Sequence, residues 1–253
     1  MKYTLITGAS AGIGQVFAQQ LAQSGHNLIL VARRKDKLDA LAKDLSEKHQ
    51  VNIETLAVDL ASPEGSENIA QQVLSADWSI EGLINNAGFG DRGAFIDLPL
   101  ARQMQMIQLN VSSLVELTYR LLPNLQRQQA PYIINVASTA AFQAGPNMAI
   151  YYATKAFVLS FSEALHEELN SQGVMVSALC PGATETEFAT EANMLDTKLF
   201  KAGAMTADAV VKQALRGKNR AIVITGWKNI FGVWMGKVSP RFVTRKLAGW
   251  LQA

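Results

Sequence analysis

Cysteine is nearly absent from this sequence, which limits the kinds of protein it can encode. Cys180 is the only cysteine among the 253 residues, so no internal disulfide framework can form. The three histidines, His26, His49 and His166, are scattered along the chain and do not have the spacing of zinc ligands. These absences predict a metal-free protein of the cytoplasm.

Long apolar runs are absent as well. A membrane-spanning helix needs about 18 or more successive apolar residues, and no stretch approaches that length. The segment before Gly8 is too short for a secretory signal peptide. Hydrophobic residues make up 49% of the chain, charged residues make up 17%, and the net charge is only +2. This composition allows a substantial core, and we expect one α/β domain over residues 1–253 with no nucleic-acid partner.

Acidic residues are missing from the last part of the chain. None follows Asp208, whereas basic and aromatic side chains are frequent there: Arg216, Lys218, Arg220, Lys228, Lys237, Arg241, Arg245, Lys246, Trp227, Phe231, Trp234 and Trp250. An extension of this kind, over about residues 227–253, suits a membrane surface, an acidic ligand or an interface between subunits. Its Gly and Pro residues interrupt helical amphipathicity, so the membrane surface is the less favoured of these alternatives.

Apolar strands and amphipathic helices alternate along most of the chain. The expected strands are residues 3–7, 27–32, 52–59, 82–86, 131–138, 174–181 and 220–225. The expected helices follow residue 14, span 35–48, open at Ser62-Pro63, and span 100–122, 150–171 and 206–215. Strands that are apolar throughout belong to parallel sheets. The sequence therefore predicts an α/β fold: a Rossmann-like, doubly wound parallel sheet of about seven strands with helices on both faces.

Residues 185–204 depart from this pattern. The segment is polar, has little periodicity and follows the end of a predicted strand, where ligands bind in open α/β sheets. We expect it to be a lid over the substrate; the alternative is a surface loop without function.

The first strand leads into a glycine-rich turn. Residues 7–14 read TGASAGIG, with the spacing G-x-x-x-G-x-G between a strand and a helix. Glycines at such a turn let the backbone approach a pyrophosphate, and the helix start offers free N–H groups. The setting predicts a dinucleotide site, although a tight turn needed only for packing would have the same composition.

The end of the second strand indicates which nicotinamide cofactor is used. An acidic residue there would bind the ribose hydroxyls of NAD, but this chain has Arg33 and Arg34. A charge-assisted hydrogen bond to a 2′-phosphate contributes about 1.5 to 3 kcal/mol. We therefore predict NADP(H), with Arg33 as the main contact and Arg34 as a second.

Tyr151 and Lys155 are one helical turn apart, and Ser138 follows an earlier strand. Side chains at i and i+4 share a helix face, so the ammonium can lie beside the phenol. A nearby cation favours the phenolate, and we expect Lys155 to lower the pKa of Tyr151 towards neutrality. An isolated Tyr-x-x-x-Lys is more often an ordinary exposed helix face, so the rest of the chain has to support the catalytic interpretation.

Together these residues resemble the short-chain dehydrogenase/reductase family, over nearly the whole chain to about residue 225. The similarity rests on an ordered set of motifs: the glycine-rich turn, Asp59, Asn85-Asn86-Ala87-Gly88, Asn110, Ser138, Tyr151-x-x-x-Lys155 and Pro181-Gly182. Neighbouring Tyr152 has no cation four residues on and is predicted to serve packing.

The resemblance implies a role for each catalytic candidate. Tyr151 would exchange a proton with the substrate oxygen, and Ser138 would hydrogen-bond that oxygen. Lys155 would lower the pKa of Tyr151 and hold the nicotinamide ribose. Asn110 would lie at a break in its helix and hold a water for proton resupply.

The resemblance also implies the contacts of NADP(H). The expected residues, besides Tyr151 and Lys155, are Gly8, Ser10, Gly12, Ile13 and Gly14 for the phosphates, Arg33 and Arg34 for the 2′-phosphate, Asp59 and Leu60 for adenine, Asn86, Ala87 and Gly88 for the adenine ribose, and Pro181, Gly182, Thr184 and Thr186 for the carboxamide. Two positions depart from the family pattern: Ala11 replaces a basic residue of many NADP-preferring relatives, and Thr184 replaces an apolar one.

The expected activity is an NADP(H)-dependent oxidoreductase that acts on a small-molecule ketone or secondary alcohol. A 3-oxoacyl thioester reductase and a membrane-surface lipid or steroid reductase are alternatives. A regulatory protein that only senses NADPH would not need Ser138, Tyr151 and Lys155 together. The resemblance also implies a homodimer or homotetramer.

Overall fold

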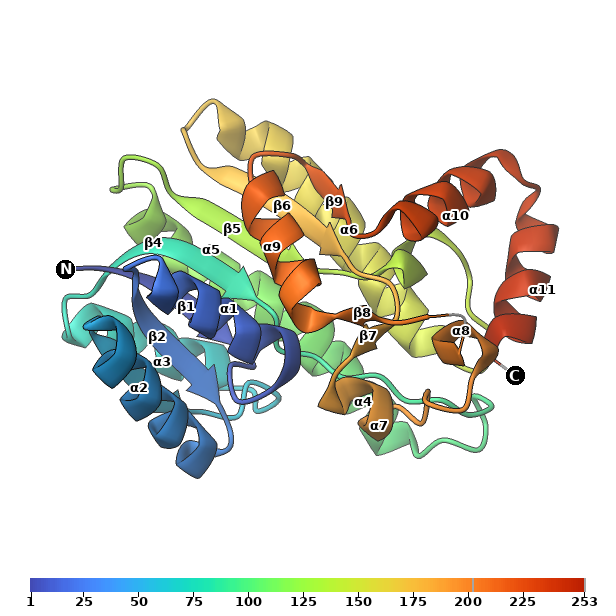
Figure 1. Ribbon diagram of the computed structural model, residues 1–253, viewed down its shortest axis with the longest axis horizontal. Helices are drawn as coiled ribbons and strands as arrows, with labels where there is room; N and C mark the ends of the chain where they lie inside the picture. Colours follow the sequence, from blue (N-terminus) through green and yellow to red (C-terminus); the bar gives the residue numbers. More distant parts are fainter. Residues whose placement is uncertain (202, 253) are drawn as a thin grey trace.

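The structure is a computed structural model that describes residues 1–201 and 203–252. Strands and helices alternate from the N-terminus to the sixth strand (Figure 1). The strands are β1 (Lys2–Thr7), β2 (Asn27–Ala32), β3 (Ile53–Ala57), β4 (Ser79–Asn85), β5 (Tyr132–Val136), β6 (Met175–Cys180), β7 (Thr184–Glu185), β8 (Met205–Thr206) and β9 (Ile222–Ile224). The α-helices are α1 (Gly12–Gln23), α2 (Lys35–His49), α3 (Gly65–Ser75), α4 (Leu100–Ile107), α5 (Ser113–Leu125), α6 (Ala149–Asn170), α7 (Glu187–Glu191), α8 (Lys198–Lys201), α9 (Ala207–Gly217), α10 (Trp227–Val238) and α11 (Arg241–Gln252). A π-helical turn, η1 (Gln108–Ser112), joins α4 to α5, and a 3₁₀ turn, η2 (Thr139–Phe142), follows β5.

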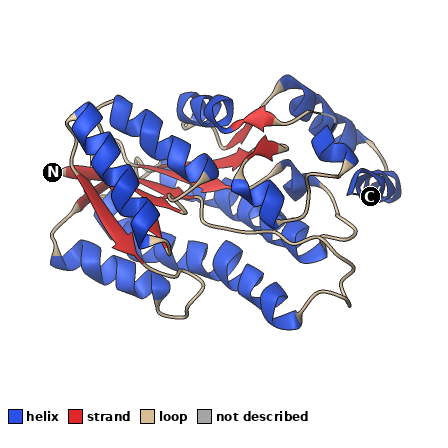
Figure 2. Ribbon diagram, turned by 60° about the horizontal axis from the view of Figure 1, so that its bottom comes forward, coloured by secondary structure: helices blue, strands red, loops and turns tan. Residues whose placement is uncertain are grey.

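Seven parallel strands form one sheet in the order β3-β2-β1-β4-β5-β6-β9. Helices α1, α2 and α9 contribute the apolar side chains on one face, and α3, α5 and α6 contribute those on the other. Figure 2 shows the sheet between these two helical layers. Burial on both faces explains why the strands are apolar throughout. The predicted doubly wound parallel sheet is confirmed.

The strand order reverses between β1 and β4. The strands after β1 extend the sheet in one direction, and the strands after β4 extend it in the other. A crevice forms outside the carboxyl ends of the strands at such a switch point. The fold thus brings the ends of β1, β4, β5 and β6 to one place, although they are far apart in the sequence.

Two helices differ from the sequence prediction. Helix α3 begins at Gly65 rather than at Ser62-Pro63, because Ser62 closes a turn in which its N–H and its hydroxyl both donate to Asp59 O, at 3.1 and 2.8 Å. The long helix expected over residues 100–122 continues to Leu125, and η1 interrupts it at Asn110, where the family resemblance implied a break.

The end of the chain corrects a sequence-based expectation. Gly and Pro residues were expected to prevent amphipathic helices there, but α10 contains Gly232 and Gly236 within its span, and Pro240 falls between α10 and α11. Gly costs a helix only about 1 kcal/mol relative to Ala, and Pro at a helix start costs little. Figure 1 shows both helices at the end of the molecule opposite α2.

Over residues 1–201 and 203–252, no helix is both long and apolar enough to cross a bilayer. Within the same ranges, no three His, Cys, Asp or Glu side chains gather as metal ligands would.

Candidate active site

A cavity of about 380 Å³ opens at the carboxyl ends of β1, β4, β5 and β6. Of the residues predicted to form the site, all but two line this cavity. The two exceptions are Gly14 and Asn110, which lie behind its wall. The convergence follows from the topology, because most of the predicted motifs come directly after a strand of the sheet, those of β2 and β3 included. Tyr151 and Lys155 reach the cavity from helix α6.

The glycine-rich turn after β1 forms one wall of the cavity. Gly12 has a φ of +56°, a left-handed conformation that favours glycine. Helix α1 begins there without a side-chain cap at Ala11 and without an acidic residue in its first turn. Its first N–H groups are therefore available to an anion. At Gly14 a Cβ would lie 2.3 Å from Gly8 O, so this glycine lets α1 pack against the turn.

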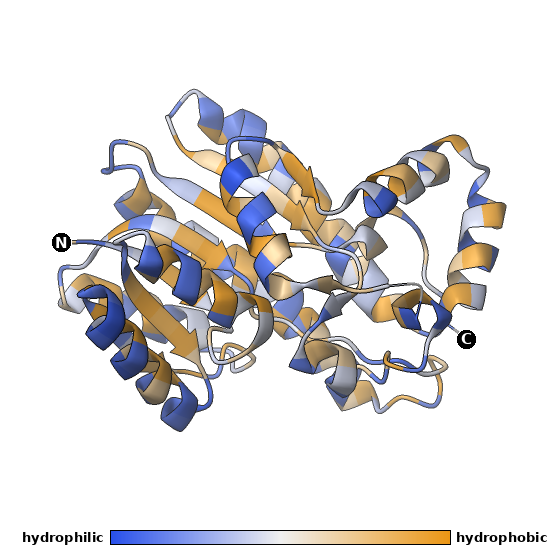
Figure 3. Cartoon of the chain, in the orientation of Figure 1, coloured by the Kyte–Doolittle hydropathy of each residue, from blue (hydrophilic) through white to orange (hydrophobic). Residues whose placement is uncertain are grey.

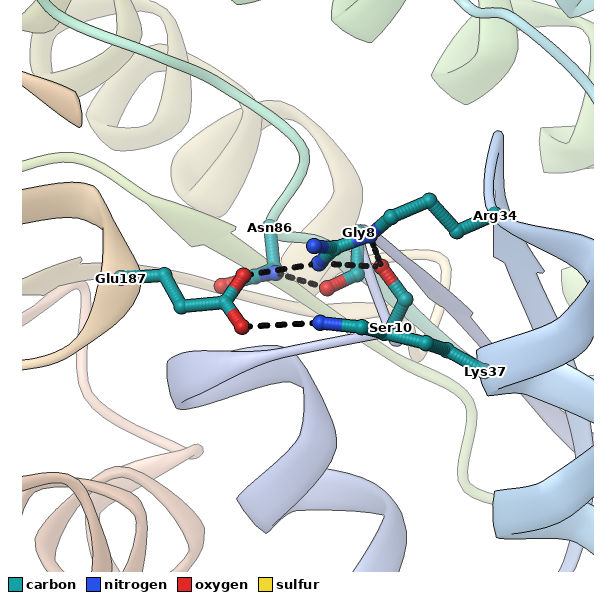
Figure 4. A network of polar contacts seen from close by, with 6 residues as sticks. All are labelled: Gly8, Ser10, Arg34, Lys37, Asn86 and Glu187. Carbon is teal, nitrogen blue, oxygen red and sulfur yellow. Dashed lines mark hydrogen bonds and ion pairs between the residues drawn. The ribbon is translucent and has the colours of Figure 1, made fainter.

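Asn86, after β4, holds the turn in place (Figure 4). Its Nδ2 donates to Thr7 O at 2.9 Å and to Gly8 O at 3.2 Å. The backbone N–H groups of Asn86 and Ala87 both donate to Thr7 Oγ1 at 2.9 Å. These bonds join the ends of β1 and β4. They therefore fix the position of the glycine-rich turn relative to the segment 86–88, and the two together form part of the predicted cofactor site.

Arg34, rather than Arg33, reaches the glycine-rich turn. Its Nε and Nη2 donate to Ser10 Oγ at 3.3 and 3.1 Å, while Arg33 is exposed at the edge of the cavity. Arg34 Nη2 also pairs with Glu187 Oε2 at 2.9 Å, and Lys37 Nζ pairs with Glu187 Oε1 at 3.0 Å (Figure 4). Lys37 and Arg34 together hold the pKa of Glu187 below its usual value.

The donor set of this wall suits a phosphorylated dinucleotide. A carboxylate already lies between Lys37 and Arg34, which shows that the two cations can share one anion. A phosphate has more oxygens than a carboxylate and accepts the same charge-assisted hydrogen bonds. The residues present therefore fit NADP(H), with the open start of α1 available to the pyrophosphate.

Thr184, whose contact the sequence left open, is buried. Its Oγ1 donates to Gly182 O at 3.0 Å, and its backbone pairs with Met205 in the two-stranded sheet of β7 and β8. The hydroxyl thus stabilises the turn after β6, and the strand pairing ties this turn to the start of α9.

The catalytic candidates lie on the wall formed by β5 and α6. Tyr151 and Lys155 are buried on α6, with exposed fractions of 8% and 6%. Lys155 Nζ lies 5.8 Å from the centre of the Tyr151 ring and donates to Val136 O at 2.7 Å. Ser138 caps η2: its Oγ accepts from Ala140 N at 3.1 Å and donates to Pro181 O at 3.4 Å.

Burial dominates the ionisation of this pair. It raises the pKa of Tyr151 well above its usual value, with the Ser138 hydroxyl acting in the opposite direction and the neighbouring Tyr152 adding to the rise. It also lowers the pKa of Lys155 to about 8. Loss of solvent penalises the charged form of each group, so the phenol keeps its proton and the amine loses it more easily.

The prediction that Lys155 lowers the pKa of Tyr151 is therefore wrong for this structure. The ammonium lies below the ring and bonds Val136 O, so its charge does not offset the desolvation of the phenol. At neutral pH Tyr151 is protonated, which is the form needed to donate a proton to a carbonyl oxygen.

Asn110 lies in the π-helical turn η1, at the predicted break of the long helix. Its Nδ2 donates to Phe89 O at 2.9 Å and to Thr154 Oγ1 at 3.1 Å, and its Oδ1 accepts from Phe89 N at 3.1 Å. A Cβ at Gly88 would lie 2.9 Å from Asn110 Oδ1 and 3.6 Å from Lys155 Nζ. Asn110 is thus beside Lys155, and π-turns of this kind are frequent at functional sites.

The far end of the cavity is formed by the predicted lid and by a helix that the sequence did not indicate. Apolar side chains from residues 187–201 and from α11 line it: Phe188, Ala189, Met194, Leu199, Phe200, Ala248 and Leu251. The predicted lid, residues 185–204, supplies the first five. Nothing in the sequence pointed to α11, because it follows no motif and meets the cavity only through tertiary packing.

Tyr152 packs as predicted. A Cβ on Gly145 would lie only 2.3 Å from the Tyr152 ring, so the ring packs closely on this glycine. The Tyr152 Oη accepts a hydrogen bond from Gln252 Nε2 at 2.8 Å. Because Gln252 is near the end of α11, this bond fixes that helix against the cavity wall.

Comparisons with known proteins agree with this geometry. A family model described as short chain dehydrogenase matches residues 2–196. The human very-long-chain 3-oxoacyl-CoA reductase is 34% identical over 192 residues, which cover 74% of this chain but only 61% of that protein. Sulfoacetaldehyde reductase 2 of Chromohalobacter salexigens is 35% identical over 186 residues, 73% of each chain. A short-chain dehydrogenase from Sphingobium yanoikuyae, solved in complex with NADPH, is 35% identical, covers 94% of this chain and 95% of its own, and has a TM-score of 0.81.

Proposed function

The chain belongs to the short-chain dehydrogenase family, and from this membership and the geometry of its site we propose that it is an NADP(H)-dependent oxidoreductase acting on a carbonyl or secondary alcohol. The observation that carries the proposal is a convergence: Ser138, Tyr151 and Lys155 line the same cavity as the glycine-rich turn. The two halves of a hydride transfer, cofactor binding and proton exchange, would thus meet in one place.

The residues divide the reaction between them. The cofactor, when bound, supplies the hydride. The Ser138 hydroxyl hydrogen-bonds the substrate oxygen, and Tyr151 donates the proton that this oxygen needs as negative charge develops. Lys155, with its pKa lowered to about 8, exchanges protons near neutrality and resupplies Tyr151 from the side of Asn110.

Arg34 and Lys37 support the choice of NADP(H). Arg34 contacts Ser10, and the two cations already share the carboxylate of Glu187. The Sphingobium yanoikuyae relative was solved with NADPH, which is consistent with the same preference in this chain.

The apolar far end of the cavity favours a substrate with a hydrocarbon part. Phe188, Met194, Leu199 and Leu251 would pack against such a group. A 3-oxoacyl thioester reductase is the second candidate, because the human relative carries that activity in its name. We further infer a cytoplasmic location, from the sequence features given above, and a homodimer or homotetramer, from the family resemblance.

The test is the loss of NADPH absorbance with a panel of ketones, 3-oxoacyl thioesters and hydroxy compounds, with NADH in parallel. Tyr151→Phe should reduce kcat by about 100-fold or more, because it removes the proton donor. Binding of NADPH, followed by fluorescence titration, should change little.

Two outcomes would reject the proposal. A wild-type protein that binds NADPH but turns over no member of the panel would be a sensor rather than an enzyme. Full activity of Tyr151→Phe would show that another group supplies the proton.

A further inference from the structure

Helix α10 turns its apolar side towards solvent. Trp227, Ile230, Phe231, Trp234, Met235 and Val238 follow the spacing i, i+3, i+4, i+7, i+8 and i+11, and they are between 41% and 75% exposed. At about 100° per residue they occupy an arc of about 140°. This spacing normally marks the side of a helix that packs on the core.

The opposite side of α10 attaches it to the protein. Val233 is the buried residue of the helix, and Asn229 Nδ2 donates to Thr225 O at 2.7 Å. The Asn229 side chain also packs directly on Gly182, where a Cβ would lie only 2.4 Å from the Asn229 Nδ2. These contacts set the rotation of α10, so its apolar stripe stays outward.

Helix α11 also exposes apolar side chains. Phe242, Val243, Leu247 and Trp250 are between 41% and 57% exposed, whereas Ala248 is buried against the cavity wall. The colouring of Figure 3 shows hydrophobic residues along both helices at this end of the molecule. We call the exposed sides of α10 and α11 the terminal face.

Positive charge surrounds this apolar surface. By the same angular count, Lys228 and Lys237 fall about 20° outside the two edges of the α10 stripe. Arg241, Arg245 and Lys246 are exposed on α11, and no acidic residue follows Asp208. Lysine side chains beside an apolar stripe can keep their charged ends in the headgroup region while the stripe enters the acyl layer.

We propose that the terminal face docks on an anionic lipid bilayer. Helices that lie in a membrane interface have this composition, with Trp and Phe on one side and Lys at the edges of that side. Anionic headgroups attract each nearby cation by about fivefold in binding. A second copy of this chain fits less well, because an isologous contact would bring the cations that flank the apolar stripe of one copy towards those of the other.

Docking would place the cavity next to the bilayer. Ala248 and Leu251 of α11 line the cavity, while Leu247 and Trp250 of the same helix belong to the terminal face. An apolar substrate dissolved in the membrane would then have a short path to Tyr151. This consequence for delivery rests on the proposed function; the docking itself does not.

The experiment is flotation of the full chain with vesicles of phosphatidylcholine, with and without phosphatidylserine. We expect binding to the anionic vesicles at low salt, weakening as salt rises. Three of the four tryptophans, Trp227, Trp234 and Trp250, are on the terminal face. Their emission should therefore shift to shorter wavelength on binding, independently of any enzyme assay.

Variants of α10 test the surface itself. Phe231→Ser with Trp234→Ser should weaken binding on the order of 100-fold, because two large apolar groups no longer enter the interface. The control is Tyr119→Ser, which removes an aromatic side chain on α5 that is more exposed than either of these two. Lys228→Gln with Lys237→Gln should lower binding on the order of 25-fold. Its control is Lys43→Gln with Lys48→Gln on α2.

Three results would overturn the proposal. One is no binding to anionic vesicles at low salt. Another is equal binding by the wild type and both α10 variants. The third concerns the assembly of the protein without vesicles, measured by light scattering. If the wild type is oligomeric and the variant with Phe231→Ser and Trp234→Ser is not, the terminal face is an interface with a second copy. Failure of docking would leave NADPH turnover intact, so it is distinguishable from failure of the proposed function.

Discussion

Tyr151 and Lys155 show how burial can reverse an expectation based on spacing. Their separation by one helical turn correctly suggested a pair, but the pKa of each depends on solvent and on the bonds that the fold provides. Burial moves the two pKa values in opposite directions, up for the phenol and down to about 8 for the amine. Two groups whose pKa values differ in this way suit distinct roles: Tyr151 is the acid that donates the proton, and Lys155 is the group that supplies Tyr151 with a new one.

The lowered pKa of Lys155 predicts how stability changes with pH. Between the folded-state pKa of about 8 and the ordinary lysine pKa of 10.5, the unfolded chain binds a proton that the folded chain does not. The free energy of unfolding should therefore rise with pH across this window. A difference of that size corresponds to about 3 kcal/mol.

Lys155→Met removes this dependence. Relative to the wild type, the variant should be most stable below pH 8 and should lose about 3 kcal/mol of that advantage by pH ~10.5. Urea unfolding of both proteins across this pH range measures the difference between their free energies of unfolding. The contributions of all other titrating groups are common to the two proteins and cancel in this difference. Lys43→Met, on the exposed face of α2, is the control and should follow the wild type. Parallel curves for the wild type and Lys155→Met would contradict the assignment of a buried ammonium.

At the scale of elements, the strands were predictable and the family resemblance placed a break at Asn110, but most helix ends were not predictable. Strand β2 begins and ends where its apolar run does, because both faces of the sheet are covered. The start of α3 depends on a turn at Asp59, and η1 depends on the tertiary contacts of Asn110. Helix α10 forms in spite of Gly232 and Gly236, because the contacts that anchor one of its sides outweigh the low helix propensity of glycine. Local patterns therefore predict element type better than element ends.

Helix α7 and the turn after β2 are joined by the carboxylate of Glu187. It pairs with Arg34 and Lys37, the cations assigned here to the 2′-phosphate of NADPH. Glu187→Gln should tighten NADPH binding about fivefold, because a negative charge no longer competes for them. Stability should change by less than about 1 kcal/mol, since the side chains are exposed. Fluorescence titration with NADPH and NADH measures the effect, which should be absent for NADH.

Arg34→Ala provides the opposite test at the same contact. It should weaken NADPH binding by about 10- to 100-fold and leave NADH nearly unchanged. Arg33→Ala is the matched control, because Arg33 lines the same edge but does not contact Ser10. A larger loss for Arg33→Ala would restore the order expected from the sequence and reject the geometry of Figure 4.

At the scale of the molecule, the sequence predicted the part of the site that depends on strand ends. The glycine-rich turn, Asn86, Ser138 and Tyr151 each follow a strand or begin a helix, so topology alone brings them together. The α11 wall could not be predicted, because it meets the cavity through contacts between residues far apart in the chain.

Arg92 makes those distant contacts. Its Nε donates to Asn193 O at 2.7 Å, its Nη1 to Gln252 O at 2.8 Å, and its Nη2 pairs with Asp196 at 2.8 Å. One side chain from the loop after β4 therefore holds both the segment 187–201 and α11 over the cavity.

Arg92→Gln should loosen both segments at once. Hydrogen bonds from a charged donor contribute about 1.5 to 3 kcal/mol each, so losing the bond to Gln252 alone should speed amide exchange in α11 about 10- to 100-fold. Exchange in residues 187–201 should rise as well, whereas the sheet should be unaffected because its core does not contact Arg92. Hydrogen–deuterium exchange with peptide resolution measures all three regions in one sample.

Activity distinguishes sealing of the cavity from a general loss of stability. If the two segments close the cavity, Arg92→Gln should raise the KM for an apolar ketone severalfold while the binding of NADPH changes little, since the cofactor wall lies on β1 and β4. Arg120→Gln is the matched control: its ion pairs with Glu116 and Glu67 lie on α5 and α3, away from the cavity. Equal exchange in α11 for wild type and Arg92→Gln would mean that Gln252 and Tyr152 hold this helix without Arg92.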